Sequence, residues 1–336
     1  MKSGCSYFGN RFVRHAAKDM QTMARQGFDF VIHTMSEFDL MFHEGNMKDI
    51  VAASHDAGLA VHMDPWGVGH VFGGEPFSGF AARNIHEAGQ VLDDGRPAAL
   101  ACPNAPLFRE YMTRWIEAAV GTGADLLFWD EPHFHNPQFL SGRKGRWGCR
   151  CSFCREKFAA SRGKPMPIEE TGEVRAFKAE CLLDFLRFLL DAGAQNGRKS
   201  ALYLSPETLP AQVPTVWAPF DDLPHLVSLG TGPYWEWFGK PIRIVEEYAR
   251  ALKKLCTERG LTTQIWIQAC KVHRGREPEI AEAVRLAAGA GADELAAWAF
   301  DGAAQESWIS CEDPAKAWAI FNDAMSRVKQ QIGNPD

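Results

Sequence analysis

Residues 126–132 read Leu-Leu-Phe-Trp-Asp-Glu-Pro, a short apolar run that ends in two acids and a proline. An apolar run of this length is typical of a parallel strand that is buried on both faces. Two adjacent carboxyl groups at the end of such a strand are costly to bury unless they are used. The segment therefore predicts a strand over Leu126–Asp130 that delivers Asp130 and Glu131 to a functional edge of the fold.

Similar apolar runs recur on both sides of this segment, and stretches with helical periodicity separate them. Glycine follows several of these stretches, as in Gln26-Gly27 and Arg259-Gly260, which is a signal for the end of a helix. The predicted strands are Cys5–Gly9, Phe28–His33, Ala60–Asp64, Leu126–Asp130, Ala201–Ser205, Val227–Thr231, Gln264–Gln268 and Leu295–Phe300. The predicted helices are Val13–Gln26, Asn46–Ala57, Pro106–Val120, Val174–Ala194, Ile242–Arg259, Glu277–Ala288 and Asp313–Ile332.

This alternation predicts an α/β fold, a single-domain (β/α)8 or TIM barrel over residues 1–336. An open doubly wound sheet is the weaker alternative, because no glycine-rich phosphate turn follows the first strand. Two loops are long: Pro65–Ala101 after the third strand and Glu131–Glu173 after the fourth. Loops of this length inside a compact domain are usually functional or ordered by a metal.

Four cysteines flank the strand with the acid pair. Cys149, Cys151 and Cys154 form a C-x-C-x-x-C, and Cys102 precedes the strand. A tetrahedral zinc site needs four thiolates within about 2.3 Å of the metal. The spacing therefore predicts a structural Zn²⁺ that ties two loops together beside the acid pair. The alternative is a set of four unrelated buried cysteines.

Composition and net charge indicate which classes of partner and which cellular compartment to expect. The formal net charge of -6 disfavours nucleic acid and anionic membranes as partners. No signal-peptide pattern opens the chain, and no apolar run approaches the roughly 18 residues of a membrane span. Five further cysteines are scattered rather than paired, which indicates a reducing cytoplasm. We expect a cytoplasmic protein, and a homo-oligomer is compatible with the sequence.

In a (β/α)8 barrel the active site lies at the carboxyl ends of the strands. There the sequence interleaves carboxylates with tryptophans, which is what a sugar site needs: indole faces stack on pyranose rings and carboxylates bind hydroxyl groups. Glycosidic cleavage also requires a protonated carboxyl group and a second carboxylate. The candidate catalytic residues are Glu131, Asp130, Glu207, Glu236 and Asp301. The candidate substrate-binding residues are Asp64, Trp66, His133, Tyr234, Trp235, Trp266, Gln268 and Trp298.

Residues 100–165 resemble the barrel domain of the clan A glycoside hydrolases, in particular the family 42 β-galactosidases. The resemblance rests on the acid pair at the strand end, on Cys102 before it and on the C-x-C-x-x-C after it. It implies a glycosidase with a structural zinc, with Glu131 as the acid/base and Asp130 in place of the family's asparagine. The chain is expected to be a divergent, single-domain relative.

One departure concerns the mechanism. The nucleophile of that family is a glutamate at the end of the seventh strand, where this chain has Gln268. A glutamine cannot form a glycosyl ester, so an inverting mechanism is expected. Glu131 would be the general acid and Glu207, Glu236 or Asp301 would be the base.

Two other functions stay open. His133 and His135, with the acid pair and His62, could form the metal site of a hydrolase or of a sugar lyase or isomerase. The loss of the strand-seven glutamate would also suit a non-catalytic carbohydrate-binding barrel. Metal content separates the first alternative, because such an enzyme needs an oxygen- and nitrogen-bound metal besides the zinc.

Overall fold

The computed structural model describes residues 1–135, 146–206, 220 and 222–333. Eight parallel strands close into a barrel in the order β1-β10-β9-β8-β7-β6-β3-β2. This closed ring confirms the TIM barrel and excludes the open sheet. The barrel strands are β1 (Lys2–Tyr7), β2 (Phe30–Thr34), β3 (Ala60–Asp64), β6 (Leu126–Asp130), β7 (Lys199–Tyr203), β8 (Leu226–Thr231), β9 (Thr262–Gln268) and β10 (Glu294–Trp298).

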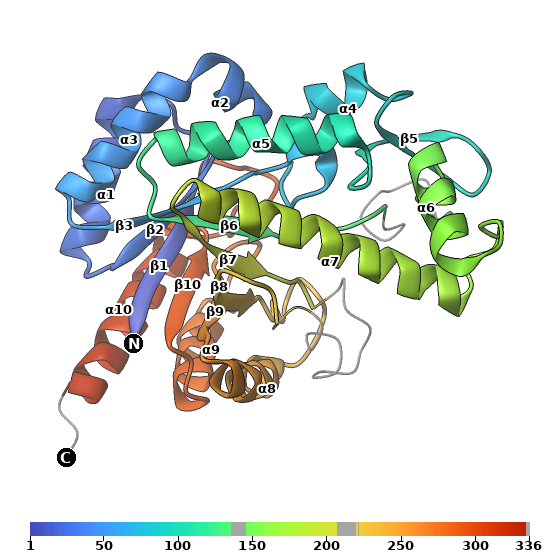
Figure 1. Cartoon of the computed structure of the whole chain (residues 1–336). Helices are drawn as coiled ribbons and strands as arrows, with labels where there is room; N and C mark the ends of the chain where they lie inside the picture. The colour runs from blue at the N-terminus through green and yellow to red at the C-terminus, as the bar shows by residue number, and fades with distance from the viewer. Residues whose placement is uncertain (136–145, 207–219, 221, 334–336) are drawn as a thin grey trace.

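All eight predicted strands are present, and β3 and β6 have the predicted bounds. Helices surround the barrel, and α5 and α7 lie side by side along one flank (Figure 1). Each of the seven predicted helices is found with ends close to those expected. They are α1 (Val13–Arg25), α3 (Glu44–Asp56), α5 (Pro106–Gly121), α7 (Gly172–Gln195), α8 (Ile244–Arg259), α9 (Pro278–Gly289) and α10 (Pro314–Gly333).

The inside of the barrel is filled by large aromatic side chains. Phe30 from β2, Phe128 from β6 and Trp266 from β9 belong to one buried apolar cluster. Gly4 on β1 leaves the room that Phe30 needs, because a Cβ at this position would lie 2.1 Å from the Phe30 ring. The barrel is therefore a packed core and not a pore, and its site lies above this layer.

The two long loops carry secondary structure of their own. The loop after β3 contains η1 (Val68–His70), α4 (Gly79–Arg83) and the antiparallel pair β4 (Gly89–Val91) and β5 (Pro97–Ala101). The loop after β6 contains α6 (Ser152–Arg162), beside one end of α7 (Figure 1).

Backbone hydrogen bonds join these two loops. Arg150 N–H donates to Val91 O (2.7 Å), and Asp93 N–H donates to Trp147 O (3.0 Å). A short helix, α2 (Glu37–Phe42), follows β2. Among the described residues, no helix is both long enough and apolar enough to cross a lipid bilayer.

Candidate active site and metal centre

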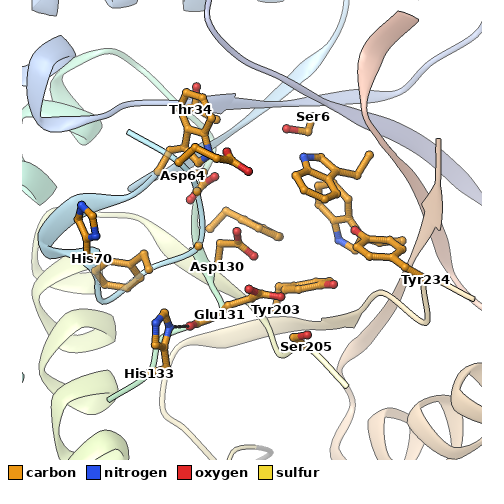
Figure 2. A pocket seen from close by; sticks show the side chains of 18 of the residues that line it. Ser6, Thr34, Asp64, His70, Asp130, Glu131, His133, Tyr203, Ser205 and Tyr234 are labelled. Atoms are coloured by element: carbon orange, nitrogen blue, oxygen red, sulfur yellow. Dashed lines mark hydrogen bonds between the residues drawn. The ribbon is translucent and has the colours of Figure 1, made fainter. Parts of the chain in front are cut away.

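A cavity of about 510 Å³ opens at the carboxyl ends of the barrel strands. Its two sides differ in chemistry. Carboxyl groups come from β3, from β6 and from the loop after β3, whereas β7 to β10 and their loops supply aromatic rings (Figure 2). The acids that line it are Asp64, Glu75, Asp130 and Glu131. The aromatic residues from β7 to β10 and their loops are Tyr203, Tyr234, Trp237, Phe238, Trp266, Trp298 and Trp308, and Trp66, Phe72 and Phe128 line the cavity from the elements that carry the acids.

Both members of the acid pair reach the cavity, although successive side chains of a strand point to opposite faces. The backbone of Glu131 explains this, because its φ of 44° lies in the left-handed region that non-glycine residues rarely adopt. The Glu131 N–H still donates to Tyr203 O of the neighbouring strand (3.0 Å). The chain thus turns at Glu131 while it remains attached to the barrel, and the turn brings both carboxyl groups to one space. Such strain is common at functional sites.

The loop after β3 closes over this acid pair. Gly73 N–H donates to Asp130 O (3.0 Å). A Cβ on Gly73 would stand 2.3 Å from Asp130 Oδ2 and 3.5 Å from Glu131 Oε2, so both carboxyl groups pack against the bare backbone of this glycine. Glycine is the one residue that allows this approach.

Glu37 at the start of α2 holds this loop in position. Its carboxylate accepts hydrogen bonds from Gly69 N–H (2.9 Å), Ser78 Oγ–H (2.5 Å) and Phe80 N–H (2.6 Å). These donors flank the segment that covers the acid pair. Glu37 is buried and does not line the cavity, so it acts as a positioning residue.

Burial and mutual repulsion raise the pKa of three of these acids. Burial raises the pKa of Asp64 well above its usual range, and the charge of Glu131 raises it further. Burial also raises the pKa of Asp130, followed by the charges of Asp64, Glu131 and Glu75. The pKa of Glu75 is raised mainly by burial. Carboxyl groups that raise one another's pKa in this way titrate as a coupled set, in which one group favours the protonated form of its neighbours.

Two histidines border the acidic side. His133 Nδ1 lies 2.6 Å from the backbone oxygen of Glu131 (Figure 2), and burial lowers the pKa of its imidazole. His70 Nε2 accepts a hydrogen bond from Ser78 N–H (3.0 Å), and burial lowers its pKa as well. Both rings are therefore neutral at pH 7, and His70 carries its proton on Nδ1.

Eight of the thirteen residues predicted for the site line the cavity: Asp64, Trp66, Asp130, Glu131, His133, Tyr234, Trp266 and Trp298. Glu207 lies outside the described residues. The other four, which are Trp235, Glu236, Gln268 and Asp301, are not part of the cavity lining. Their position corrects the expectation that they face a substrate.

The side chains of Trp235 and Gln268 form hydrogen bonds inside the protein. Trp235 is buried in the main core, and its indole N–H donates to a carboxylate oxygen of Glu279 on α9 (2.7 Å). Gln268 Oε1 accepts from the backbone N–H groups of Glu236 (3.0 Å) and Trp237 (3.3 Å), and its Nε2 donates to Cys270 O (3.0 Å). The amide thus fixes the loop after β8 against the end of β9.

Glu236 and Asp301 lie in loops that direct them elsewhere. The side chain of Glu236 is 5% exposed and pairs with His273 and with Arg276, whose Nη1 is 3.4 Å away. Asp301 lies in η2 (Phe300–Ala303) at a φ of 51° and is exposed. Alternation along a strand could not predict either direction, because both residues follow the end of a strand.

The cavity also contains residues that the sequence did not single out. They are Ser6, Thr34, His70, Phe72, Gly73, Gly74, Glu75, Leu100, Phe128, Tyr203, Ser205, Trp237, Phe238 and Trp308. The pair Gly73-Gly74 directly before Glu75 is a local signal for close backbone approach and could have indicated this loop. Trp308, in the loop after β10, had no such signal.

The four predicted cysteines converge into one buried cluster, in which all four sulfur atoms lie within 4.8 Å of one another. Cys102 Sγ is 3.5 Å from the sulfur atoms of both Cys151 and Cys154. A tetrahedral zinc–thiolate site has sulfur–sulfur distances of roughly 3.8 Å, and a disulfide has a bond of about 2.05 Å. The donor set therefore suits a soft, tetrahedral metal ion, and all nine cysteines are free of disulfides.

The four cysteines lie in different electrostatic surroundings, and those of Cys151 favour the thiolate. Asn104 Nδ2 donates to Cys154 Sγ (3.3 Å), and Cys151 N–H donates to Cys149 Sγ (3.4 Å). Cys151 is also the N-cap of α6, where the helix dipole favours negative charge. Hydrogen bonds from the other three thiols lower the pKa of Cys151 strongly, whereas burial raises that of Cys102.

Within the described ranges, these cysteines are the one group of cysteine, histidine and acidic side chains whose donor atoms converge tightly enough to hold a metal ion. His62, considered for a catalytic metal, stacks on Phe30 inside the barrel (centroid distance 4.9 Å), and burial lowers its pKa to about 4. None of the four cysteines lines the cavity. The cysteine cluster is thus separate from the acidic site.

No protein-family model matches the chain, and no curated protein matches its sequence. Solved structures with a similar fold include D-allulose 3-epimerase from Methylomonas sp. (12% identity, 98% of each chain covered, TM-score 0.51). They also include a GH5-4 broad specificity endoglucanase from an uncultured bacterium (13% identity, 92% of this chain and 84% of the other, TM-score 0.51). A β-glucosidase is similar too (12% identity, 94% and 88%, TM-score 0.52). At these identities the likeness establishes the (β/α)8 barrel alone.

Proposed function

We propose that the protein is a glycoside hydrolase and that Glu131 is its general acid. One observation carries the proposal: the cavity sets the close carboxyl groups of Asp64, Asp130 and Glu131 against a wall of aromatic rings. Aromatic faces bind the apolar face of a sugar ring, and a carboxyl group that keeps its proton can protonate a leaving oxygen. The similar folds of an endoglucanase and a β-glucosidase agree with this class of substrate.

In the proposed reaction, Glu131 donates its proton to the glycosidic oxygen while the bond from that oxygen to the anomeric carbon breaks. Water forms the new bond to the anomeric carbon and gives one proton to Asp64, which acts as the base in its ionised form while Glu131 holds the proton of the coupled group. The configuration is then inverted. We favour inversion because the amide of Gln268, at the position of the nucleophile in family 42, is held by backbone groups. We also propose that the protein is a distant relative of the family 42 β-galactosidases.

We propose further that the cysteine cluster holds zinc with a structural role. When bound, zinc would neutralise the thiolates of Cys102, Cys149, Cys151 and Cys154 and fix the two loops that they belong to. The free state of all nine cysteines supports a reducing compartment, the cytoplasm. Carbohydrate is the proposed partner. The mass of the protein in solution tests whether it forms a homo-oligomer.

Glu131→Gln tests the acid. The variant should lose about 10²–10⁴-fold in kcat on unactivated glycosides, which is the usual contribution of a general acid, and it should still bind them. Turnover by purified protein on a panel of disaccharides measures this. Asp301→Asn, which changes an exposed acid outside the cavity, is the matched control and should behave as the wild type. Most of the wild-type activity in Glu131→Gln would rule out the assignment.

A second function has one specific observation in its favour. All the acids of the described cavity lining come from β3, β6 and the loop after β3, so proton removal and return would take place on one side of a sugar. A lyase or isomerase works in this way, and the fold of D-allulose 3-epimerase is similar. Product analysis by NMR distinguishes the reactions, because hydrolysis splits a glycosidic bond with uptake of water and isomerisation does not. Binding without any turnover would instead support the non-catalytic barrel.

A further inference from the structure

A continuous series of aromatic rings leads from the inside of the barrel to the rim of the cavity. Tyr234 stacks on Trp298 (centroid distance 5.7 Å), Trp298 contacts Trp237 (5.7 Å), and Trp237 meets Trp308 edge-on (6.0 Å). All four rings line the cavity. Tyr234 is buried, whereas Trp308 is 50% exposed. The binding surface thus continues outward beyond the carboxyl groups.

The outermost rings are held in place by a lysine. The Nζ of Lys271 lies 4.4 Å from the ring centroid of Trp237 and 4.1 Å from that of Trp308, so one ammonium group attracts both indoles. The backbone of Lys271 strengthens the arrangement, because its N–H donates to Ile309 O (2.7 Å) and thereby joins the loops after β9 and β10. Trp308 is therefore ordered before any ligand arrives, which reduces the entropic cost of binding.

An exposed indole that is fixed beside a polar cavity is a typical platform for a ligand. One sugar ring covers about one indole, so a ring placed at the carboxyl groups leaves Trp308 uncovered. We infer that the substrate is an oligosaccharide and that its leaving-group sugar stacks on Trp308, with Lys271 as the positioning residue. This inference rests on the proposed function and specifies its substrate class.

Trp308→Ala tests the inference when two kinds of substrate are compared. Galactosyl, glucosyl and mannosyl fluorides have no leaving-group ring, and the matching di- and trisaccharides have one. The variant should lower kcat/KM on the oligosaccharides by about three- to tenfold more than on the fluorides, as expected for one lost ring contact. Lys271→Met, which keeps an apolar side chain but removes the charge, should show the same pattern with a smaller loss.

Phe42→Ala is the matched control, because it removes a similarly exposed aromatic ring (61%) from α2, outside the cavity lining. Phe42→Ala should leave kcat/KM unchanged on the glycosyl fluorides and on the oligosaccharides. Equal losses of Trp308→Ala on both kinds of substrate, or no loss on either, would overturn the inference.

Binding of the same trisaccharides to Glu131→Gln, measured by calorimetry with and without Trp308→Ala, separates this inference from the proposed function. Weaker binding without Trp308, together with a wild-type protein that cleaves none of these sugars, would uphold the subsite and reject the hydrolase. Cleavage that does not depend on Trp308 would uphold the hydrolase and reject the subsite. A protein that neither binds nor cleaves these sugars would contradict both.

Discussion

Asp64 is only 4% exposed at the end of β3, and its neighbours in the cavity include two further acids. Its register partner on β2 is Thr34, which has no charge. Thr34 therefore offers no positive charge that would favour the ionised form, and burial together with the charge of Glu131 raises the pKa of Asp64. The buried carboxyl groups of the site therefore lower the stability of the fold, which is common where the chemistry of a site needs a bound proton.

We predict that Asp64→Asn raises stability and flattens its dependence on pH. In the unfolded chain Asp64 titrates near its ordinary pKa of about 3.9, and in the fold its pKa is higher. Between these values the folded state binds more protons, so wild-type stability is lost as pH rises through this window. The variant should gain about 0.5–2 kcal/mol at pH 7 and lose activity.

Thermal unfolding from pH 4 to 8 measures this difference. Asp323→Asn, on the surface of α10, provides the matched control and should leave the pH profile in place. An Asp64→Asn variant that is less stable than the wild type at pH 7 would contradict the prediction.

The loop after β3 acts as one element that covers the acids. It is anchored by the carboxylate of Glu37 and presents the backbone of Gly73 to Asp130. Its contacts with α2 and β6 thus determine where the covering glycine lies. A change at the covering glycine should therefore affect the site far more than the stability of the barrel.

Gly73→Ala should displace the carboxyl group of Asp130, because the new Cβ would stand 2.3 Å from Oδ2. The backbone of Gly73 is not in the left-handed region, so the effect is one of space and not of backbone strain. We expect kcat/KM to fall by about 10²-fold, as for misplaced catalytic groups, while the melting temperature changes little.

Gly45→Ala in α3 is the control, because a Cβ there meets no atom within 4 Å. It should stabilise the helix by about 0.5–1 kcal/mol and leave activity as it is. Wild-type kinetics in Gly73→Ala would show that Asp130 has no part in the reaction.

For the whole molecule, the cysteine cluster connects two excursions from the barrel. Cys102 directly follows β5, the last strand of the excursion after β3, and Cys149, Cys151 and Cys154 belong to the loop after β6. The same two loops supply Glu75 and the residues that follow Glu131. A metal in the cluster would therefore fix both sides of the acidic wall from outside the cavity.

We predict that Cys151→Ser lowers the melting temperature by about 5 °C or more and speeds hydrogen exchange in residues 146–173. It should alter the chemistry less than it alters stability. Chelator should destabilise the wild type and have no further effect on the variant. Elemental analysis gives the zinc content, and Cys256→Ser in α8 is the control that leaves it unchanged.

Native protein without zinc and with four freely titratable thiols in the cluster would reject the metal. A Cys256→Ser variant that also loses zinc would reject the assignment of the four ligands.

The sequence by itself determined the barrel and the cysteine centre. Strands and helices follow from local hydrophobic periodicity, so β3 and β6 were predicted with their bounds. The closed order of the barrel strands followed from the number of predicted strands and from their alternation with helices. The spacing of Cys149, Cys151 and Cys154 likewise restricts three ligands to one short segment. Four strand ends, Asp64, Asp130, Thr231 and Gln268, were predicted where the structure has them. Asp64, Asp130, Trp266 and Trp298, predicted for the carboxyl ends of the strands, line the cavity.

Only the tertiary structure decided which side chains beyond the strand ends turn inward. Trp235 and Glu236 lie next to Tyr234 and Trp237, yet they point to Glu279 and to His273. The left-handed turn at Glu131, the approach of Gly73 and the position of Trp308 also depend on partners far away in the chain. Past the last residue of a strand there is no ladder to set the direction of a side chain, so contacts between loops determine it.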